Sequence, residues 1–498
     1  MKQLSHWING GFETSTSDRS GTIYNPATGV ATTKVPFATP EEIERTISVA
    51  RSASRSWGTS SLSARTEVLF EFRHLVNARK DELAEAITSE HGKVHSDALG
   101  EVSRGLENIE FASGIASHLK GGFSSQVSSG VDVHSLRQPV GVVTGITPFN
   151  FPVMVPLWMM ANALACGNAM ILKPSEKDPS ASLLLAQYLK DAGLPDGVFN
   201  VLHGDGDVVG ALLEHPGIDA VSFVGSTPIA RSIYSRATAS GKRAQALGGA
   251  KNHMVVLPDA DIDLAADAAV SAAYGSAGER CMAISVVVAV GEVAEPLIDA
   301  ITKRLNVLKI GPGNDPASEM GPLITREHRD KVASFVAGAA SEGARVVVDG
   351  RDVIFDGDAS EGFFLGASLI DNVQPGMKIY DEEIFGPVLS VVRVSSYSDA
   401  RDLVNENQYG NGVAIFTRDG GAARQFTVEV TCGMVGVNVP IPVPVASYSF
   451  GGWKDSLFGD AHMYGPSGIE FFTRSKVVTS RWPDPATSVV DLGFPKTR

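Results

Sequence analysis

Apolar residues recur along this chain at two spacings, one typical of helices and the other typical of buried strands. Thr39, Pro40 and Glu42 mark a helix start, with a capping box and a proline at the first helical position. Apolar residues follow at helical spacing, namely Ile43, Ile47, Ala50 and Trp57. The pattern predicts an amphipathic surface helix here, and further helical stretches over about residues 62–90 and 95–118.

A Gly- and Ser-rich break at 121–126 ends this helical region. Beyond it, Val127, Val131 and Val133 begin an alternating pattern that predicts a hairpin arm. From residue 140, helical segments alternate with strand-like runs, which are VGVVTGI, AMILKP, GVFNVLHG and IDAVSFVG. Strand followed by helix, repeated, predicts a parallel sheet with crossover helices.

A second series of alternating strands and helices follows residue 281. Its strand-like runs are SVVVAV, RVVVDG, PVLSVVRV, GNGVAIFT and MVGVNVP, and its helices include LIDAITKRL and SDARDLVNEN. The sequence therefore predicts an α/β fold with two parallel-sheet units. The last apolar run, IEFFTRSKVVTSRW, reads as an extended strand that docks on another surface.

Composition narrows the class of protein. A chain of 498 residues exceeds the size of one hydrophobic core, so two or three domains are expected. The net charge of −14 argues against nucleic acid or an anionic membrane as a partner. The apolar stretch 141–172 carries prolines, glycines and asparagines, which favours a buried strand and helix over a membrane span.

The three cysteines, Cys166, Cys281 and Cys432, form an odd and sparse set without metal-ligand spacing. This set predicts neither a disulfide framework nor a metal site. It suits a free reactive thiol in the cytoplasm, and we read no secretory signal at the N-terminus.

Cys281 and Asn150 are the candidate catalytic residues. A lone cysteine more often packs in a core than reacts. Cys281, however, stands in the run GERCM, and Asn150 lies between two prolines in GITPFNFP, about 130 positions upstream. An amide donor of this kind can stabilise the oxyanion that forms when a thiolate attacks a carbonyl.

A phosphate-binding turn is predicted at Gly225 and Ser226. In FVGSTPIARSI an apolar strand ends at Gly225 and Ser226 opens a helix, whose first backbone donors can face a pyrophosphate. The other glycine-rich run, HGDGDVVG, is one residue too long for the dinucleotide fingerprint. We expect that run to form a turn.

Lys173 and Glu176 follow a buried strand, at the carboxyl edge where parallel sheets bind ligands. A carboxylate accepts hydrogen bonds from ribose hydroxyls but repels a 2′-phosphate, so Glu176 favours NAD over NADP. The alternative interpretation is a solvated salt bridge within the loop.

Seven ordered motifs resemble the aldehyde dehydrogenase superfamily over nearly the whole chain, namely GITPFNFP, LKPSEK, FVGST, LGGAKNHMVVLPDAD, GERCM, EEIFGPVL and GVNVPIPVP. The resemblance implies Cys281 as nucleophile and Asn150 as oxyanion donor. It implies that the NAD-binding residues are Thr147, Phe149, Lys173, Glu176, Lys177, Gly225, Ser226, Gly248, Glu383 and Phe385. Within that set, Glu383 would contact the nicotinamide ribose and Phe385 would lie near the ring.

The resemblance also implies how the chain divides. The expected parts are an NAD-binding domain (1–120 and 140–250), a catalytic domain with the nucleophile (251–449), a return segment (450–469) and a small β oligomerisation arm (121–139 and 470–498). Because a terminal strand of this kind often docks on a second copy, we expect a homodimer or homotetramer.

One departure from the superfamily's commonest pattern bears on the reaction. Hydrolytic members carry ELGG, whose glutamate activates water, whereas this chain has Ala246, Leu247, Gly248 and Gly249. An alignment shifted by one residue places Leu247 there, which takes no proton either. Water is a poor nucleophile without a base or metal, but a thiol is partly ionised at neutral pH. We therefore expect coenzyme A (CoA), rather than water, to take the acyl group from Cys281.

This departure, together with GAKNHMVVLPDA, GERCM and the proline series, looks like the CoA-acylating methylmalonate-semialdehyde and malonate-semialdehyde dehydrogenases. The likeness implies oxidation and decarboxylation of a small semialdehyde to propionyl-CoA or acetyl-CoA, through a thioester on Cys281. It implies that Arg104 and Arg280 bind the substrate carboxylate, which suits the planar guanidinium. A single helical arginine such as Arg104 is more often a solvated charge.

Two alternatives stay open at the level of sequence. A CoA-independent NAD aldehyde dehydrogenase would release free acid, with Glu279 or Glu383 as base. A binding protein that keeps the fold without activity is disfavoured because Cys281, Asn150 and Glu383 all persist.

Overall fold

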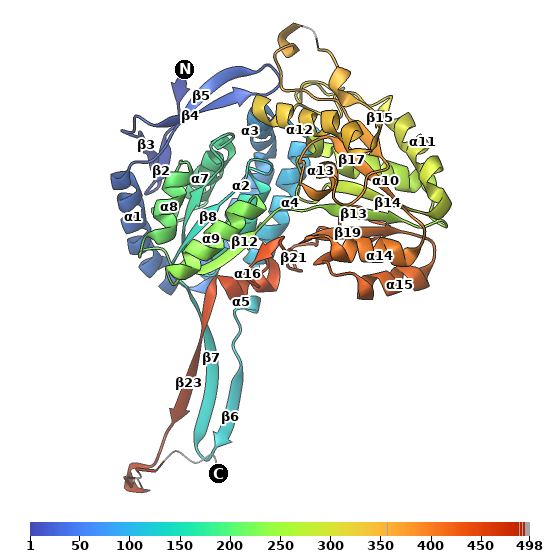
Figure 1. Ribbon diagram of the computed structural model, residues 1–498. Coiled ribbons are helices and arrows are strands. Elements are labelled where there is room, and N and C mark those ends of the chain that lie inside the picture. The colour runs from blue at the N-terminus through green and yellow to red at the C-terminus, as the bar shows by residue number, and fades with distance from the viewer. Residues whose placement is uncertain (356, 488, 491, 494–498) are drawn as a thin grey trace.

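The protein is described by a computed structural model that covers residues 1–355, 357–487, 489–490 and 492–493. Figure 1 shows two α/β bodies side by side, with a slender three-stranded arm that projects away from the first body. The predicted fold class, two parallel-sheet α/β units with a small β arm, is confirmed.

The first body is built on an eight-stranded sheet. In spatial order its strands are β22 (Leu457–Phe458), β12 (Arg243–Leu247), β11 (Ala220–Val224), β8 (Val142–Ile146), β9 (Ala169–Lys173), β10 (Phe199–Val201), β2 (His6–Ile8) and β3 (Gly11–Glu13). The five strands from β12 to β10 are parallel, and short antiparallel strands close both edges. β22 comes from the segment 450–469, so that segment contributes a strand to the first sheet.

The register of this sheet brings its loops together at one edge. Ile146 at the end of β8 pairs with Lys173 at the end of β9, and also with Phe223 near the end of β11. Val224 in turn pairs with Leu247, the last residue of β12. The loops that begin at 147, 174, 225 and 248 therefore emerge side by side, which is the usual ligand edge of a parallel sheet.

Helices surround this sheet, and they are α1 (Pro40–Thr59), α2 (Leu62–Ala78), α3 (Lys80–His91), α4 (His95–Ser113), α5 (Ile115–His118), α6 (Met154–Ala165), α7 (Ser180–Asp191), α8 (Gly206–Glu214) and α9 (Thr227–Ala239). The predicted capping box of α1 is present, since Thr39 accepts from the Glu42 N–H and Glu42 accepts from the Thr39 N–H. The run HGDGDVVG turns at its start and then enters α8.

Two predicted helical stretches are each divided in two, which corrects the ranges 62–90 and 95–118. The first breaks at Arg79, whose backbone leaves the helical region while its guanidinium pairs with Asp191 and lies over Tyr188. The second breaks at Gly114. The break at Arg79 lets α2 and α3 turn separately so that both pack on α4 and α7.

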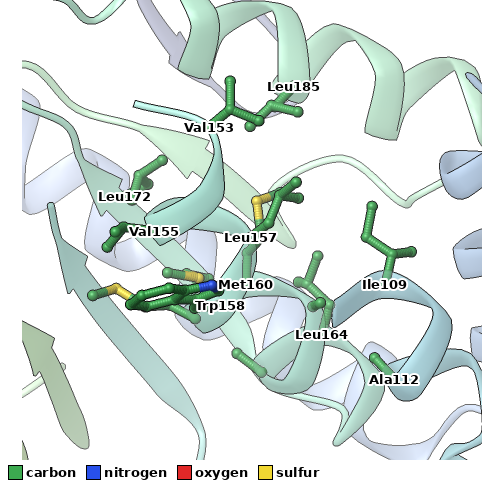
Figure 2. Close-up of a cluster of buried hydrophobic side chains, with 14 of the residues drawn as sticks. Ile109, Ala112, Val153, Val155, Leu157, Trp158, Met160, Leu164, Leu172 and Leu185 are labelled. Carbon is green, nitrogen blue, oxygen red and sulfur yellow. The ribbon is translucent and has the colours of Figure 1, made fainter. Parts of the chain in front are cut away.

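The apolar stretch 141–172 forms β8, α6 and β9, and every residue of α6 is buried. Figure 2 shows Leu157, Trp158 and Leu164 of α6 among Ile109 of α4 and Leu185 of α7. The interpretation of this stretch as buried strand and helix is confirmed. In the part of the chain that the structure describes, no helix is long and apolar enough to cross a membrane.

The second body is built on a seven-stranded sheet. Its strands in spatial order are β15 (Arg345–Val348), β16 (Ser368–Asp371), β17 (Val388–Val394), β14 (Ile284–Val290), β13 (Asn252–Val256), β19 (Gly412–Phe416) and β20 (Met434–Val437). Only β15 among these is antiparallel to its neighbour. The helices around it are α10 (Ile262–Tyr274), α11 (Ala294–Leu305), α12 (Arg326–Ala339), α13 (Lys378–Asp381), α14 (Tyr397–Glu406) and α15 (Gly420–Glu429).

The arm contains β23 (Thr473–Arg481), β7 (Val131–Pro139) and β6 (Phe123–Ser128) in an antiparallel sheet. The predicted strand from residue 469 is wrong at its start, because Ile469–Phe471 end the helix α16 (Gly465–Phe471). The Arg243 guanidinium donates to the carbonyls of Glu470, Phe471 and Thr473, which satisfies the end of this helix and delays the strand. Part of the predicted arm, residues 488, 491 and 494–498, lies outside the described residues.

Two small sheets complete the fold. One is formed by β1 (Lys2–Gln3), β5 (Val30–Pro36) and β4 (Ser20–Asn25), and the other by β18 (Tyr409–Gly410) and β21 (Trp453–Lys454).

Candidate active site

Cys281 follows a backbone turn of unusual conformation between α10 and β14. Ser276, Ala277 and Gly278 have φ values of 53°, 52° and 75°, and for the first two this left-handed conformation costs about 1–3 kcal/mol each. Only glycine fits at 278, because a Cβ there would lie 2.2 Å from the Gly386 carbonyl oxygen. The backbone before the nucleophile is therefore held in a conformation that the surrounding structure must stabilise.

Two buried amides supply that support. Asn252 Nδ2 donates to the carbonyl oxygens of Cys281 and Ala283, both at 2.9 Å, and Asn411 Nδ2 donates to the Cys281 carbonyl at 3.1 Å. Because both carbonyl lone pairs of Cys281 are used, the nucleophile's backbone position is fixed from the second sheet.

Cys281 opens onto a cavity of about 230 Å³ between the two bodies. The predicted site residues that line it are Phe149, Asn150, Gly225, Ser226, Gly248, Cys281, Glu383 and Phe385. The structure thus brings together both candidate catalytic residues and six of the ten candidate cofactor residues. His328 and Lys331 of α12 also line the cavity and were not identified from the sequence.

The loop of Asn150 is anchored by a buried ion pair that sequence reasoning missed. Lys93 Nζ donates to the Asn150 carbonyl at 2.6 Å and to Glu101 Oε2 at 2.8 Å. Glu101 Oε1 accepts from the backbone N–H groups of Val153 and Met154 at the start of α6. Charged residues beside helix ends normally face solvent, so nothing in the sequence marks this pair as buried.

The remaining predicted cofactor residues lie at the sheet edge beside the cavity. Thr147 and Lys173 are buried there, and the Thr147 N–H donates to the Lys173 carbonyl at 3.2 Å. Lys173 Nζ lies 3.3 Å from Glu176 Oε2, so the loop salt bridge weighed as an alternative is present. Lys177 Nζ lies 4.9 Å over the Phe149 ring.

This edge fits a dinucleotide. Ser226 precedes the 13-residue helix α9 and makes no side-chain cap, so the first N–H groups of that helix are left for an anion. Gly225 and Gly248 bring backbone without side chains to the cavity wall, and the Glu176 side chain is half-exposed. These residues can therefore hold the phosphates and ribose of NAD.

The electrostatics of the cavity favour neutral side chains. Burial, with a smaller contribution from the Glu383 carboxylate, raises the pKa of the Cys281 thiol to about 12. Burial likewise raises the pKa of Glu383 to about 7, against the opposing effects of the Ala250 N–H, Lys251 and Lys331. Before any ligand binds, Cys281 is thus a thiol and Glu383 is close to half-ionised at neutral pH.

The two residues in place of the hydrolytic glutamate lie on opposite sides of the first sheet. Ala246 packs with Ile146 and Phe223, whereas Leu247 belongs to the apolar cluster against which Cys281 packs. Neither side chain accepts a proton. Among the described residues that line the cavity, Glu383 is the only carboxylate.

Glu279, weighed above as a base, is completely buried outside this cavity. Its Oε1 accepts from the Ile324 N–H at 3.3 Å, and its carboxyl lies 3.6 Å from His91 and 3.7 Å from His328. Burial raises its pKa to about 8, so at neutral pH it is mostly protonated. A protonated carboxyl that does not reach the cavity is poorly suited to activate water there.

The two candidate substrate-binding arginines do not line the cavity, and both are paired with carboxylates. Arg104 binds both oxygens of Glu107 at 2.7 and 2.8 Å and donates to the Pro444 carbonyl at 3.0 Å. Arg280 Nη2 lies 2.6 Å from Asp97 Oδ1. A substrate carboxylate must therefore compete with Glu107 or Asp97 for these guanidinium groups.

Comparison with known proteins agrees with this geometry. Residues 12–478 match the aldehyde dehydrogenase family. A malonate-semialdehyde dehydrogenase of Pseudomonas aeruginosa is 52% identical over 98% of each chain, and one of Halalkalibacterium halodurans is 46% identical over 97% of this chain and 99% of its own.

Solved structures give the same result. The methylmalonate-semialdehyde dehydrogenase of Oceanimonas doudoroffii superposes with a TM-score of 0.96 at 51% identity, over 98% of this chain and 99% of its own. An NAD-bound structure from Sinorhizobium meliloti 1021, provisionally assigned to the same enzyme, has a TM-score of 0.96 at 50% identity with the same coverage. The chain therefore belongs to the aldehyde dehydrogenase family.

Proposed function

We propose that this protein is an NAD-dependent, CoA-acylating dehydrogenase that oxidises and decarboxylates methylmalonate or malonate semialdehyde. The observation that carries the proposal is that neither residue that aligns with the water-activating glutamate of hydrolytic relatives, Ala246 or, with a shift of one, Leu247, can take a proton. Of these two, Leu247 lies on the nucleophile's side of β12 and is apolar. The names of the relatives reported above support the choice of substrate.

In the proposed reaction the Cys281 thiol loses its proton to solvent and its Sγ bonds to the aldehyde carbon, whose C=O π electrons move onto oxygen. The resulting oxyanion accepts hydrogen bonds from the Asn150 amide and the Cys281 N–H. One such donor is worth about 3 kcal/mol of transition-state stabilisation. NAD, when bound, supplies the hydride acceptor, and the residues proposed to hold it are Thr147, Phe149, Lys173, Glu176, Lys177, Gly225, Ser226, Gly248, Glu383 and Phe385. Loss of hydride leaves an acyl group on Cys281 as a thioester.

The fate of this thioester follows from the proton acceptors in the cavity. Water needs a base to attack at a useful rate, whereas a thiol with a pKa near 8.5 already contains a few per cent thiolate at neutral pH. The β-carboxylate, held by Arg104 and Arg280 in exchange for their present partners, leaves as CO2 when the electrons of its C–C bond move toward the thioester carbonyl. The resulting enolate takes a proton from solvent at carbon, which gives the acetyl or propionyl thioester. The acetyl or propionyl group then passes to the CoA sulfur.

A second candidate function rests on Glu383, whose pKa near 7 suits a general base. If Glu383 activated water, the protein would release free acid without CoA.

Product analysis separates the two functions. We expect malonate semialdehyde, NAD and CoA to give acetyl-CoA by mass spectrometry, and methylmalonate semialdehyde to give propionyl-CoA. Desulfo-CoA, which lacks the thiol, and the variant Cys281→Ser serve as controls and should give no acyl-CoA. Free acid released at the same rate with desulfo-CoA would contradict the proposal and favour hydrolysis by Glu383.

We also propose the domain division given above, and an arm that docks on a second subunit to give a homodimer or homotetramer. Exposed apolar side chains along the arm, namely Phe123, Val127, Leu136 and Val477, support this docking. Light scattering with size-exclusion chromatography tests it. A reducing compartment such as the cytoplasm suits the proposed thiol nucleophile.

A further inference from the structure

Residues 249–252, which lead from β12 into the start of β13, contact both parts of the active site. The Ala250 N–H donates to Glu383 Oε1 at 2.9 Å. The next residue, Lys251, donates through Nζ to the carbonyls of Ile379 and Glu382, at 2.8 and 2.7 Å. Asn252 then holds the Cys281 backbone, as described above. Three consecutive residues therefore connect the segment that carries Glu383 to the strand that carries the nucleophile.

The burial of Lys251 is the least expected feature of this segment. Its side chain is 2% exposed, and its ammonium lies in no salt bridge within the part of the chain that the structure describes. Burying an ammonium without a close counter-ion is costly, so such a group is retained where its position serves another purpose. One of the two carbonyls that it binds belongs to Glu382, directly before Glu383, and the other belongs to Ile379 in α13.

We propose that Lys251 is a positioning residue for the cofactor site: its ammonium fixes residues 379–382, directly before Glu383, through two backbone carbonyls, and it favours the charged form of Glu383 that binds the nicotinamide ribose. This inference rests on the proposed contact between Glu383 and the ribose. Lys251 is the lysine of the motif GAKNH, and the family resemblance implied no role for it.

The charges around the pair define the expected effect. The groups that face Lys251 are Asp381, Glu382, Glu383 and His253, and those that face Glu383 are Lys251, Lys331, Tyr409 and Cys281. Burial lowers the pKa of Lys251 to about 7, and the Glu383 carboxylate opposes that shift. The two groups therefore stabilise each other's charged forms. Removing the ammonium leaves the Ala250 N–H and the Lys331 charge to favour the carboxylate.

The sign of the effect follows from this coupling. Without the Lys251 charge the pKa of Glu383 rises further, by about one unit for a nearby opposite charge. A ribose hydroxyl donates to a carboxylate more strongly than to a neutral carboxyl. The affinity for NAD should therefore fall on the acid side, and the midpoint of its pH dependence should move to higher pH.

Lys242 supplies a matched control. It is also buried, 7% exposed, and its Nζ donates to two carbonyls, those of His215 and Ile218, at 2.7 and 3.2 Å. It does not line the cavity. If Lys251 only capped carbonyls in the core, Lys242→Met and Lys251→Met should have the same effect.

The test is calorimetric titration of NAD into Lys251→Met, Lys242→Met and the unmodified protein across the neutral pH range, without aldehyde or CoA. We expect Lys251→Met to bind NAD about fivefold more weakly than the unmodified protein at neutral pH. The midpoint of the pH dependence of NAD affinity should shift upward by about one pH unit, and the two affinities should become equal at higher pH. Lys242→Met should leave the midpoint unchanged. Should Lys251→Met fail to fold, Lys251→Gln is shorter, removes the charge and keeps a donor.

An unchanged midpoint in the folded Lys251 variant, or an equal shift in Lys242→Met, would overturn the proposal. Glu383→Gln should abolish the weakening of NAD binding at acid pH. If that weakening survived in Glu383→Gln, Glu383 would not be the group that titrates, and the proposal would also be overturned. None of these outcomes depends on which nucleophile accepts the acyl group. A failure here is therefore distinguishable from a failure of the CoA-acylating function.

Discussion

Placing a carboxylate on the nucleophile's side of β12 should turn acyl transfer into hydrolysis. The variant is Leu247→Glu, because Leu247 lies in the cluster against which Cys281 packs. Leu247 is 3% exposed, so burial should raise the pKa of a glutamate there, as it raises the pKa of Glu383 to about 7. The ionised fraction of such a carboxyl can accept a proton from water.

The expected gain is the contribution of a general base, about 10²-fold to 10⁴-fold in the CoA-independent rate. The expected loss of stability is about 3 kcal/mol or more, since an apolar core residue is removed and a polar group is buried. The assay measures NADH and free acid without CoA, below the melting temperature of the variant.

Ala246→Glu is the matched control, because Ala246 packs on the opposite side of the sheet. It should lose stability without gaining hydrolysis. A folded Leu247→Glu protein that forms the thioester at the normal rate yet stays dependent on CoA would contradict a role for this position in hydrolysis, and so would an equal gain in Ala246→Glu.

Three further predictions follow from the same geometry. Lys93→Met leaves the Glu101 carboxylate buried without its ion partner and should lower the free energy of unfolding by about 3–5 kcal/mol in urea titrations; a loss below about 1 kcal/mol would contradict a buried pair. Because the pKa of Cys281 is raised, its alkylation by iodoacetamide in the free protein should accelerate about tenfold per pH unit from neutral to alkaline pH, and a plateau near pH 7 would show a thiol that is already ionised. Arg104→Lys and Arg280→Lys should each raise KM for malonate semialdehyde without raising it for propanal, which has no carboxylate, and an equal rise for both aldehydes would exclude carboxylate binding.

Much of the fold could be predicted because its signals are local. The alternation of apolar runs and helical segments predicts both sheets, and the capping box of Thr39 and Glu42 predicts the start of α1. The break at Gly114 has a local cause, a glycine, but the other errors occurred where a distant residue decides the outcome. Arg243, more than 220 positions before the carbonyls it binds, ends α16 and displaces the start of β23.

The same difference between local and distant signals holds for the candidate site. Motif residues such as Asn150 and Cys281 could be identified because their neighbours in sequence are distinctive, and the structure places them on one cavity. The partners that hold them could not, since burial of a lysine such as Lys93 or Lys251 depends on contacts remote in sequence. Likewise, nothing local shows that Arg280 pairs with Asp97, which lies 183 positions away.

The central claim is that an acyl group remains on Cys281 until a thiol removes it. Rapid mixing of the protein with NAD and malonate semialdehyde, with NADH recorded from the first milliseconds, tests this claim most directly. Without CoA the account predicts a burst of about one NADH per Cys281 followed by almost no turnover, and addition of CoA should restore a steady rate. Sustained NADH formation without CoA, with an equal amount of free acid, would contradict it.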